Sequence, residues 1–246
     1  MKAMVFAAGL GTRLKPITDT LPKALVPVCG EPLLAHTLRK LQKAGYTEAV
    51  VNIHHFPELI RDYLARQDFG LKISISDESA QLLETGGGIL HAKALLQGGE
   101  PFLAHNVDIV SDVDLAWFRA QMRPGALATL LVSERQTSRY LLFDEDMRLV
   151  GWTNIITGEV RSPYPNLDPS ACHRLAFSGI HNISPAIFDA FDALAVPERF
   201  PIVDFYIKVC DRYPIYGAVA KDLRLVDVGK FETLPEAEEI CRSILL

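Results

Sequence analysis

A glycine-rich turn followed by two basic residues is the clearest feature of this sequence that could perform chemistry. The segment Gly9-Leu10-Gly11-Thr12-Arg13 comes directly after the apolar stretch Lys2–Ala7, and Lys23 follows a little further along the chain. Small residues after a strand let main-chain N–H groups approach an anion closely, and Arg13 and Lys23 add two positive charges. The pattern is neither a Walker A loop nor a complete G-x-G-x-x-G motif, and a plain tight turn explains the glycines equally well. It therefore indicates a candidate phosphate site.

An aspartate directly after another strand-like segment is a candidate metal ligand. Asp108 ends the sequence His105-Asn106-Val107-Asp108, which follows the hydrophobic stretch Pro101–His105. In an α/β protein, an acid at the carboxyl end of a strand is well placed to hold a cation against phosphate oxygens. Asp112 and Asp114 are nearby, but Ser111-Asp112-Val113-Asp114 fits a capping box that starts a helix, where acids are favourable without any metal.

The glycines Gly86-Gly87-Gly88 open an apolar segment with helical periodicity. Inside a helix, each glycine costs roughly 1 kcal/mol relative to alanine. Something must therefore approach the backbone closely at this point, and two explanations are open. Either another element of the protein packs tightly against the glycines, or a flat ligand does.

The elements that position these residues follow an alternating pattern in the first half of the chain. The pattern predicts strands and helices in turn, with strands at Lys2–Ala7, Glu48–Ile53, Lys72–Ser76 and Pro101–His105 and helices at Pro32–Ala44, Glu58–Arg66 and Gly88–Leu96. Such alternation is typical of an α/β fold with a doubly wound, mostly parallel, Rossmann-like sheet flanked by helices. Ligands of such folds bind at the carboxyl ends of the strands.

The second half of the chain has a different pattern. After a predicted helix at Asp112–Met122, strand-like segments follow one another with few helical residues between them, at Ala126–Ser133, Tyr140–Phe143 and Leu149–Trp152. The proline-containing segment Arg161–His173 is predicted to be a mobile loop. The remaining predictions are strands at Leu175–Ile183, Ile215–Ala220 and Leu223–Asp227 and helices at Pro185–Asp192, Asp204–Cys210 and Phe231–Arg242. We expect a single α/β domain over residues 1–246 with a small antiparallel lobe.

Composition limits the classes of function. The chain has 246 residues, of which 49% are hydrophobic and 22% charged, so it can bury a sizeable core. Its net charge of -5 argues against a nucleic-acid-binding surface but leaves room for a small positive pocket for a phosphorylated metabolite. No apolar run approaches the ~20 residues of a membrane span, so no membrane partner is expected. The four cysteines form no C-x-x-C pair, which favours free thiols in a reducing cytoplasm.

The pattern across Ala7–Val28 resembles the start of the sugar-nucleotidyltransferases, also called nucleotide-sugar pyrophosphorylases. It reads G-x-G-T-R-L, then a proline and a threonine, then P-K-x-L-x-P-V. The resemblance implies that the glycine loop wraps the nucleotide base and phosphates, that Arg13 stabilises the triphosphate, and that Lys23 contacts the phosphates during transfer. The loop residues implied in nucleotide binding are Ala8, in place of a usual glycine, and Gly9, Gly11 and Thr12.

The same resemblance assigns roles further along the chain. The segment starting at Gln81 is implied to close over the base. Asp108 is implied to bind metal, although Val107 replaces the family's usual glycine. The motif Val226-Asp227-Val228-Gly229 is implied to supply a second metal ligand, Asp227. Two carboxylates suffice for Mg²⁺, because that ion keeps waters and takes phosphate oxygens as its remaining ligands. The other implied contacts are Gln81, Thr85, Gly86, Gly87 and Asn106 for the nucleotide and Ser178 and Gly179 for the sugar. The glutamate-lysine pair of some branches is missing at Val150–Asn154, so no second catalytic lysine is expected.

The resemblance implies transfer of a nucleoside monophosphate from a triphosphate to a sugar 1-phosphate, with release of pyrophosphate and no covalent enzyme intermediate. The form L-E-T-G-G-G at Leu83–Gly88 is similar to the branch that uridylylates N-acetylmuramate 1-phosphate. One alternative is guanylyl transfer from GTP to mannose 1-phosphate or a heptose 1-phosphate, and another is a non-catalytic nucleotide-sugar sensor. No hexapeptide β-helix pattern follows the main domain, and a homodimer is compatible with an enzyme of this size.

Overall fold

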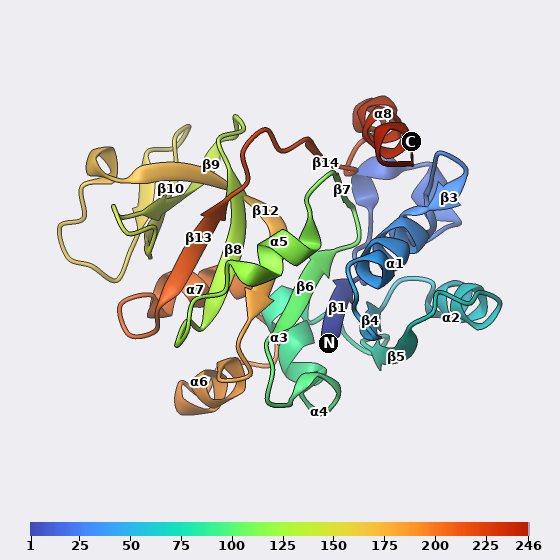
Figure 1. Ribbon diagram of the computed structural model, residues 1–246, viewed down its shortest axis with the longest axis horizontal. Coiled ribbons are helices and arrows are strands. Elements are labelled where there is room, and N and C mark those ends of the chain that lie inside the picture. The colour runs from blue at the N-terminus through green and yellow to red at the C-terminus, as the bar shows by residue number, and fades with distance from the viewer. Residues whose placement is uncertain (246) are drawn as a thin grey trace.

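A twisted ten-stranded sheet runs through the centre of the molecule (Figure 1). The structure is a computed structural model and describes residues 1–245. In the first half of the chain, four strands run parallel in the order β5–β4–β1–β6. Their bounds are Lys2–Phe6 for β1, Glu48–Ile53 for β4, Lys72–Asp77 for β5 and Phe102–Asn106 for β6. All four predicted strands are therefore present.

The strand β12 (His173–Ile183) joins this parallel region to an antiparallel lobe. Its last residues pair antiparallel with β6 on one side and with β8 on the other, and β13 lies parallel to β8. Its first residues pair with β9, which continues through β10 to β11. The bounds are Ala128–Ser133 for β8, Arg139–Phe143 for β9, Leu149–Asn154 for β10, Glu159–Arg161 for β11 and Ile215–Val219 for β13. The predicted mostly parallel central sheet with a small antiparallel lobe is confirmed.

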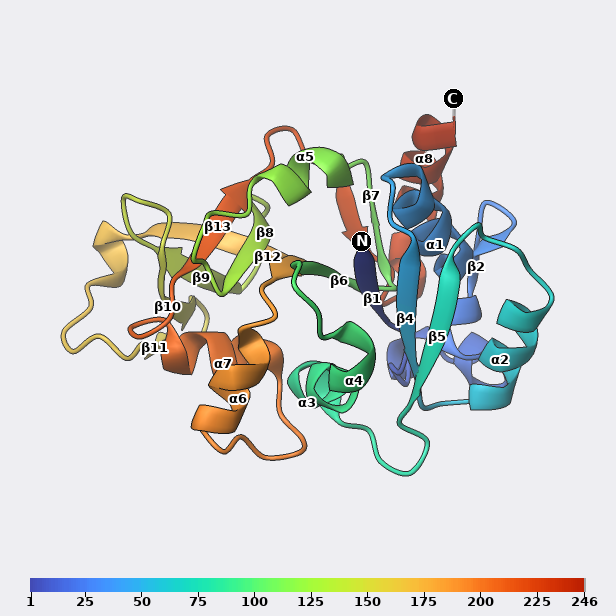
Figure 2. The same cartoon turned by 60° about the horizontal axis from the view of Figure 1, so that its bottom comes forward.

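Side chains along the central strand β1 point alternately to the two faces of the sheet, and apolar side chains on both faces explain why helices cover both. Ala3 and Val5 point into one hydrophobic core, and Met4 and Phe6 point into the other. The first core lies under α1 (Leu33–Lys43), α2 (Pro57–Ala65), α5 (Leu115–Ala120) and α8 (Leu234–Leu245). The second lies under α3 (Glu84–His91), α4 (Lys93–Leu96), α6 (Ile187–Ala193) and α7 (Ile202–Val209). Figure 2 shows these two helical layers on opposite sides of the sheet.

Short elements close the carboxyl edge of the parallel strands. Three 3₁₀ turns follow β1, namely η1 (Thr12–Leu14), η2 (Ile17–Asp19) and η3 (Lys23–Leu25). The strand β7 (Ile109–Ser111) pairs antiparallel with β14 (Leu225–Asp227), and β2 (Pro27–Val28) pairs with β3 (Glu31–Pro32). Two further 3₁₀ turns are η4 (Pro169–Ala171) and η5 (Phe231–Thr233).

Several helix predictions were wrong at their ends; the helix predicted at Phe231–Arg242, for example, is the turn η5 followed by α8. The helix predicted at Gly88–Leu96 begins at Glu84, so the glycines lie inside α3, and it breaks at Ala92 before α4. The helix predicted to begin at Asp112 begins at Leu115, because Ser111 still belongs to β7 and Asp114 is the N-cap. The Asp114 carboxylate accepts hydrogen bonds from Ala116 N and Trp117 N at 2.8 and 3.2 Å. That contact supports the capping interpretation of Asp114.

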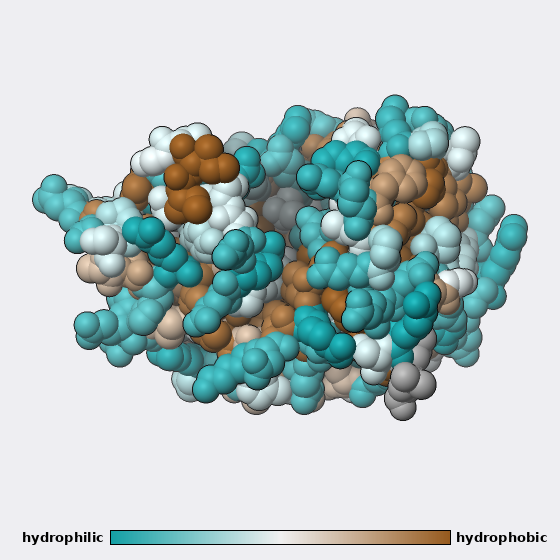
Figure 3. Space-filling model, turned by 90° about the horizontal axis from the view of Figure 1, so that it is seen from above, coloured by the Kyte–Doolittle hydropathy of each residue, from teal (hydrophilic) through white to brown (hydrophobic). Residues whose placement is uncertain are grey.

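The surface is mostly polar. Figure 3 shows a largely hydrophilic face with apolar residues in separate groups. Among residues 1–245, no helix is both long and apolar enough to cross a bilayer.

Candidate active site

The turn after β1 places Lys23 beneath the glycine loop. Gly11 has a φ of 63°, which favours glycine, and its carbonyl accepts a hydrogen bond from Thr18 Oγ1 at 2.8 Å. A Cβ atom on Gly11 would lie 2.9 Å from Thr18 Cγ2 and 3.0 Å from Lys23 Cβ. The loop therefore packs directly on the stem of Lys23, whose side chain is buried although it carries a charge.

Lys23 lies between the two predicted metal ligands. Its ammonium group donates a hydrogen bond to the Asp108 carboxylate and lies 3.8 Å from Asp227 Oδ1. Asp108 follows β6, and Asp227 is the last residue of β14, so the antiparallel pairing of β7 with β14 brings the two aspartates to the same place. The main chain reinforces this arrangement, because Val228 N donates to Asp108 O at 2.9 Å.

The two carboxylates carry more negative charge than Lys23 neutralises. Burial and the nearby charge of Asp108 raise the pKa of Asp227, while the positive charges of Lys23, Arg13 and Arg135 oppose that rise. Arg13 lies beside this pair, because a Cβ on Gly229 would be 2.7 Å from Arg13 Nη2 and 3.0 Å from Asp227 Oδ1. Two carboxylates that meet at one ammonium group supply the kind of oxygen ligands that Mg²⁺ prefers. Residues 1–245 contain no group of three or more His, Cys, Asp and Glu side chains arranged for a metal, so the candidate site consists of these two carboxylates.

A cavity of about 340 Å³ opens next to these aspartates at the carboxyl ends of β1, β4 and β6. Five of the predicted site residues line it together, namely Ala8, Gly9, Thr85, Asn106 and Asp108. Its other lining residues are Phe6, Asn52, Glu78, Leu82 and Glu84. The fold therefore brings the glycine loop, the start of α3 and the end of β6 around one hollow, which is called the nucleotide cavity below.

The glycines of α3 contact another part of the protein. The N–H groups of Gly86 and Gly87 both donate to Phe200 O, at 2.9 and 3.2 Å. A Cβ on Gly86 would lie 2.3 Å from the Phe200 ring, and one on Gly87 would lie 2.1 Å from Glu198 O. Of the two explanations that the sequence left open, tight packing accounts for these glycines, and a role toward the base stays a prediction.

The remaining predicted nucleotide contacts lie outside this cavity. Gln81 is exposed and lines a separate hollow with His91 and Glu198. Thr12 is exposed within η1, and Gly11 serves the turn above Lys23. Their roles toward a nucleotide also stay predictions.

Sequence reasoning missed a buried polar pair at the back of the nucleotide cavity. Asn52 accepts a hydrogen bond from Ala7 N and donates one to Glu78 Oε1, both at 2.7 Å. Leu83 N donates to the other Glu78 oxygen at 3.1 Å. Burial raises the pKa of Glu78, and the hydrogen bonds from Asn52 and Leu83 partly oppose the rise. The only signal in the sequence was that both residues come at or just after the ends of neighbouring parallel strands.

A second cavity, of about 660 Å³, lies in the antiparallel lobe. We call it the lobe cavity, and its lining is Arg135, Thr137, Arg139, Leu141, Trp152, Asn154, Glu159, Arg161, Phe177, Pro201, Val203 and Asp204. The predicted sugar contacts lie beside it without lining it. Ser178 is buried, with a hydroxyl that has no hydrogen-bond partner in the described residues, and Gly179 packs against Asn106 and Ile109. Their neighbour Phe177 does line the cavity, and its carbonyl accepts a hydrogen bond from Arg135 at 3.1 Å.

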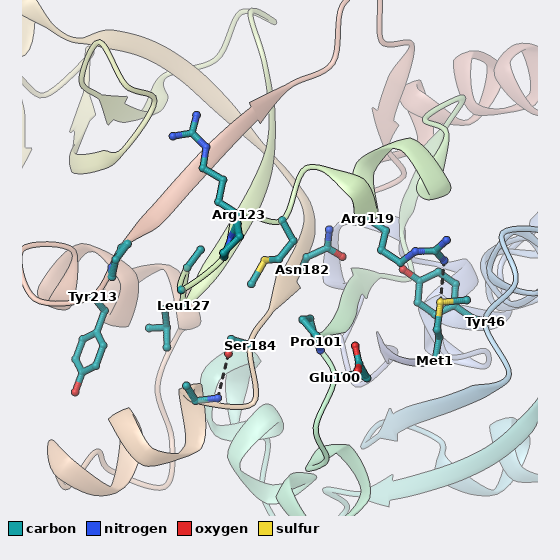
Figure 4. A pocket seen from close by; sticks show the side chains of 16 residues that line it. Met1, Tyr46, Glu100, Pro101, Arg119, Arg123, Leu127, Asn182, Ser184 and Tyr213 are labelled. Carbon is teal, nitrogen blue, oxygen red and sulfur yellow. Dashed lines mark hydrogen bonds between the residues drawn. The ribbon is translucent and has the colours of Figure 1, made fainter.

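A third cavity, of about 590 Å³, lies at the opposite, amino-terminal edge of the parallel strands (Figure 4). None of the predicted site residues lines it. Arg119 there donates to Met1 Sδ at 2.9 Å and lies over the ring of Tyr46, while Arg123 points out of the cavity and over the Tyr216 ring. The guanidinium groups of Arg119 and Arg123 therefore both contact other side chains of the protein.

The fold is an α/β sheet whose carboxyl edge gathers a glycine turn, a buried lysine and two aspartates beside one cavity. Residues 2–140 match the family described as nucleotidyl transferase. The chain is 35% identical to the N-acetylmuramate alpha-1-phosphate uridylyltransferase of Neisseria meningitidis, over 82% of this chain and 84% of that one. It is 53% identical to the enzyme of the same name from Caulobacter vibrioides, over 44% of this chain and 46% of that one.

Other comparisons agree with this family. The catalytic subunit beta of mannose-1-phosphate guanylyltransferase from Danio rerio is 33% identical over 59% of this chain and 42% of its own length. A crystal structure of UDP-glucose pyrophosphorylase complexed with UDP-glucose shares the fold, with a TM-score of 0.76 and 20% identity over 98% of both chains. The chain belongs to the nucleotidyl transferase family, and it is a sugar-1-phosphate nucleotidyltransferase. The resemblance found in the sequence is confirmed.

Proposed function

We propose that this enzyme transfers a uridylyl group from UTP to N-acetylmuramate 1-phosphate and releases pyrophosphate. The observation that carries the proposal is the 35% identity to the Neisseria uridylyltransferase over 84% of that protein. The shorter but stronger match to the Caulobacter enzyme supports the same substrates.

The nucleotide cavity takes UTP in this proposal. Ala8, Gly9, Thr85 and Asn106 surround the nucleotide, and the Glu78 carboxylate accepts the N3–H of uracil, since a buried acceptor fits that donor. Arg13 holds the β- and γ-phosphates beside Gly229. The other predicted contacts, Gly11, Thr12, Gln81, Gly86 and Gly87, hold the loops around the nucleotide.

Lys23 stabilises the negative charge that develops at the attacked phosphorus. Its buried ammonium group is fixed by the Asp108 carboxylate and the glycine loop, so little reorganisation is needed when that charge appears. The acceptor phosphate oxygen attacks the α-phosphorus in line, and the enzyme contributes by holding both substrates in that geometry. Ser178 and Gly179 support the wall on the acceptor side.

Asp108 and Asp227 are the residues that would hold Mg²⁺. A cation held by these two carboxylates would supply positive charge that offsets the negative charge of the substrate phosphates. We further propose that residues 1–246 act as one catalytic domain. In this proposal the enzyme is a homodimer in the cytoplasm, and neither nucleic acid nor a membrane is its partner.

The test is pyrophosphate release with a panel of triphosphates and sugar 1-phosphates in the presence of Mg²⁺. UTP with N-acetylmuramate 1-phosphate should give the highest kcat/KM. Preference for GTP with mannose 1-phosphate or a heptose 1-phosphate would replace this proposal with guanylyl transfer, which the similarity to the Danio rerio guanylyltransferase favours as the second candidate. Release with no pair would indicate a nucleotide-sugar sensor.

The same assay tests the metal ligands. Asp108→Asn and Asp227→Asn should each lower kcat by about 10³-fold or more, because each removes one of only two protein carboxylates from a metal that orients both substrates. Asp112→Asn is the matched control, since Asp112 is nearby but forms an ion pair with Arg224 at 2.9 Å. Near wild-type turnover of either of the first two variants would show that the metal assignment is wrong.

A further inference from the structure

Three arginines line the lobe cavity, and they differ in how their charge is used. Arg161 is fully engaged by the protein itself. It lies 2.9 Å from Asp204 and 3.6 Å from Glu159, and its guanidinium group stacks on the Trp152 ring at 4.0 Å. Both carboxylates of the cavity wall therefore serve Arg161.

Arg135 and Arg139 have no carboxylate partner within residues 1–245. Arg135 donates to the carbonyl of Phe177, and only the main-chain N–H of Arg139 takes part in a hydrogen bond, with Thr137 Oγ1. Neither positive charge is thus neutralised by a side chain of the protein, and each is available to a negatively charged group of a ligand.

The two free arginines lie in different parts of the cavity. Arg135 donates to the carbonyl of Phe177, and Gly179, two residues further along the same strand, packs against Asn106 of the nucleotide cavity. Arg135 is thus on the side of the nucleotide cavity, where the 1-phosphate of the acceptor must bind. Arg139 begins β9 and pairs in register with Asn154, at the far end of β10. A ligand whose phosphate reaches Arg135 would present a different group to Arg139.

We infer that Arg139 determines acceptor specificity by binding a carboxylate carried by the sugar. The inference rests on the proposed function, because N-acetylmuramate carries a lactyl carboxylate on O3, separate from the phosphate on C1. N-acetylglucosamine 1-phosphate is the same sugar phosphate without that acid. Arginine suits the role, because its planar fork binds a carboxylate through two parallel hydrogen bonds.

The experiment compares kcat/KM for N-acetylmuramate 1-phosphate and N-acetylglucosamine 1-phosphate, with UTP, in wild type, Arg139→Met and Arg139→Lys. Arg139→Met should lose about 10- to 100-fold with the acidic acceptor, mostly through KM, and change little with the neutral one. Arg139→Lys should recover part of the loss because it keeps the charge. Arg174→Met is the matched control, since Arg174 is an exposed arginine of the same lobe that does not line the cavity.

The outcomes separate the two proposals. If wild type does not use N-acetylmuramate 1-phosphate, the proposed function is wrong and this inference is wrong with it. If wild type prefers that acceptor and Arg139→Met keeps the same preference, or loses equally with both acceptors, the function stands and the role of Arg139 is refuted. Thermal unfolding of each variant identifies a loss that comes from folding, and Arg139→Lys then decides the question.

Discussion

The nucleotide cavity and the lobe cavity are built in different ways. The nucleotide cavity is formed by loops and element ends at the carboxyl edge of parallel strands, and the small residues Ala8 and Gly9 form one part of its lining. The lobe cavity is formed by long side chains on the faces of β9, β10, β11 and β12 and the start of α7. If the proposed function is correct, the first construction offers few side chains for exchange, whereas the second could change its acceptor by exchanging side chains.

The difference also concerns how charge is arranged. In the nucleotide half, Lys23 is buried and held between two carboxylates. In the lobe, Arg135 and Arg139 are exposed residues. Substitutions in the nucleotide half should therefore affect kcat, the KM for UTP or folding, whereas those in the lobe should affect the choice of acceptor.

The largest effect is expected at Lys23. Lys23→Met should lower kcat by about 10²- to 10³-fold with every acceptor, because it removes a preorganised charge beside the attacked phosphorus. Lys15→Met is the control, since Lys15 is an exposed lysine of the same loop that pairs with Asp19 at 2.9 Å. Steady-state pyrophosphate release measures both variants. If Lys23→Met changes acceptor preference and leaves kcat within a few-fold of wild type, the division between the two halves is wrong.

A smaller effect separates two glycines of the nucleotide half. Gly87→Ala should destabilise the fold by about 1–3 kcal/mol, because its Cβ would lie 2.1 Å from Glu198 O. Gly9→Ala should leave the unfolding temperature unchanged, since nothing lies within 4 Å of its added Cβ. It should instead raise KM for UTP by roughly 10-fold, because Gly9 lines the nucleotide cavity. Thermal unfolding and UTP titration distinguish the two. A stable Gly87→Ala variant with weak UTP binding would restore the ligand explanation for that glycine.

The smallest effect is expected where β6 pairs with β12, at the junction of the two halves. It concerns the change in the free energy of unfolding per pH unit. Burial holds the pKa of His105 on β6 and of His181 on β12 at about 3. Between pH 6.5 and 3 the unfolded chain binds protons that the folded protein cannot, so stability falls as the pH falls. Each histidine contributes up to about 1.4 kcal/mol per pH unit.

Denaturant unfolding between pH 6.5 and 3 measures how the free energy of unfolding depends on pH. His181→Phe, made together with Tyr206→Phe because the two side chains share a hydrogen bond of 2.8 Å, should reduce the acid dependence by up to one proton. His173→Asn, which replaces an exposed histidine of the same strand, should leave the slope unchanged. An unaltered slope in the double variant would mean that His181 is protonated in the folded state.

Prediction from sequence succeeded where the backbone dictates the site. The glycine turn, Lys23 and Asp108 each follow a buried strand, and parallel strands bring such positions to one edge, so their proximity could be expected from the pattern. The partnership of Asp227 with Asp108 came from family resemblance, because no local pattern shows that β14 pairs with β7.

Prediction failed where side chains from distant segments meet. The packing of Gly86 and Gly87 on Phe200 depends on a segment more than a hundred positions away, and the sequence around Phe200 carries no motif. Arg135 and Arg139 were overlooked for the same reason, because exposed arginines have no distinguishing pattern until the walls of a cavity surround them.

The segment from Glu198 to Asp204 connects the start of α3 with the lobe cavity. Glu198 and Phe200 pack against the first turn of α3, while Pro201 and Asp204 line the lobe cavity. A substitution that moves this segment to fit another sugar should therefore also move the start of α3, which lines the nucleotide cavity. The preference for a base and the preference for a sugar would then change together in evolution. A substitution that changes the sugar preference would need a second substitution that restores nucleotide binding.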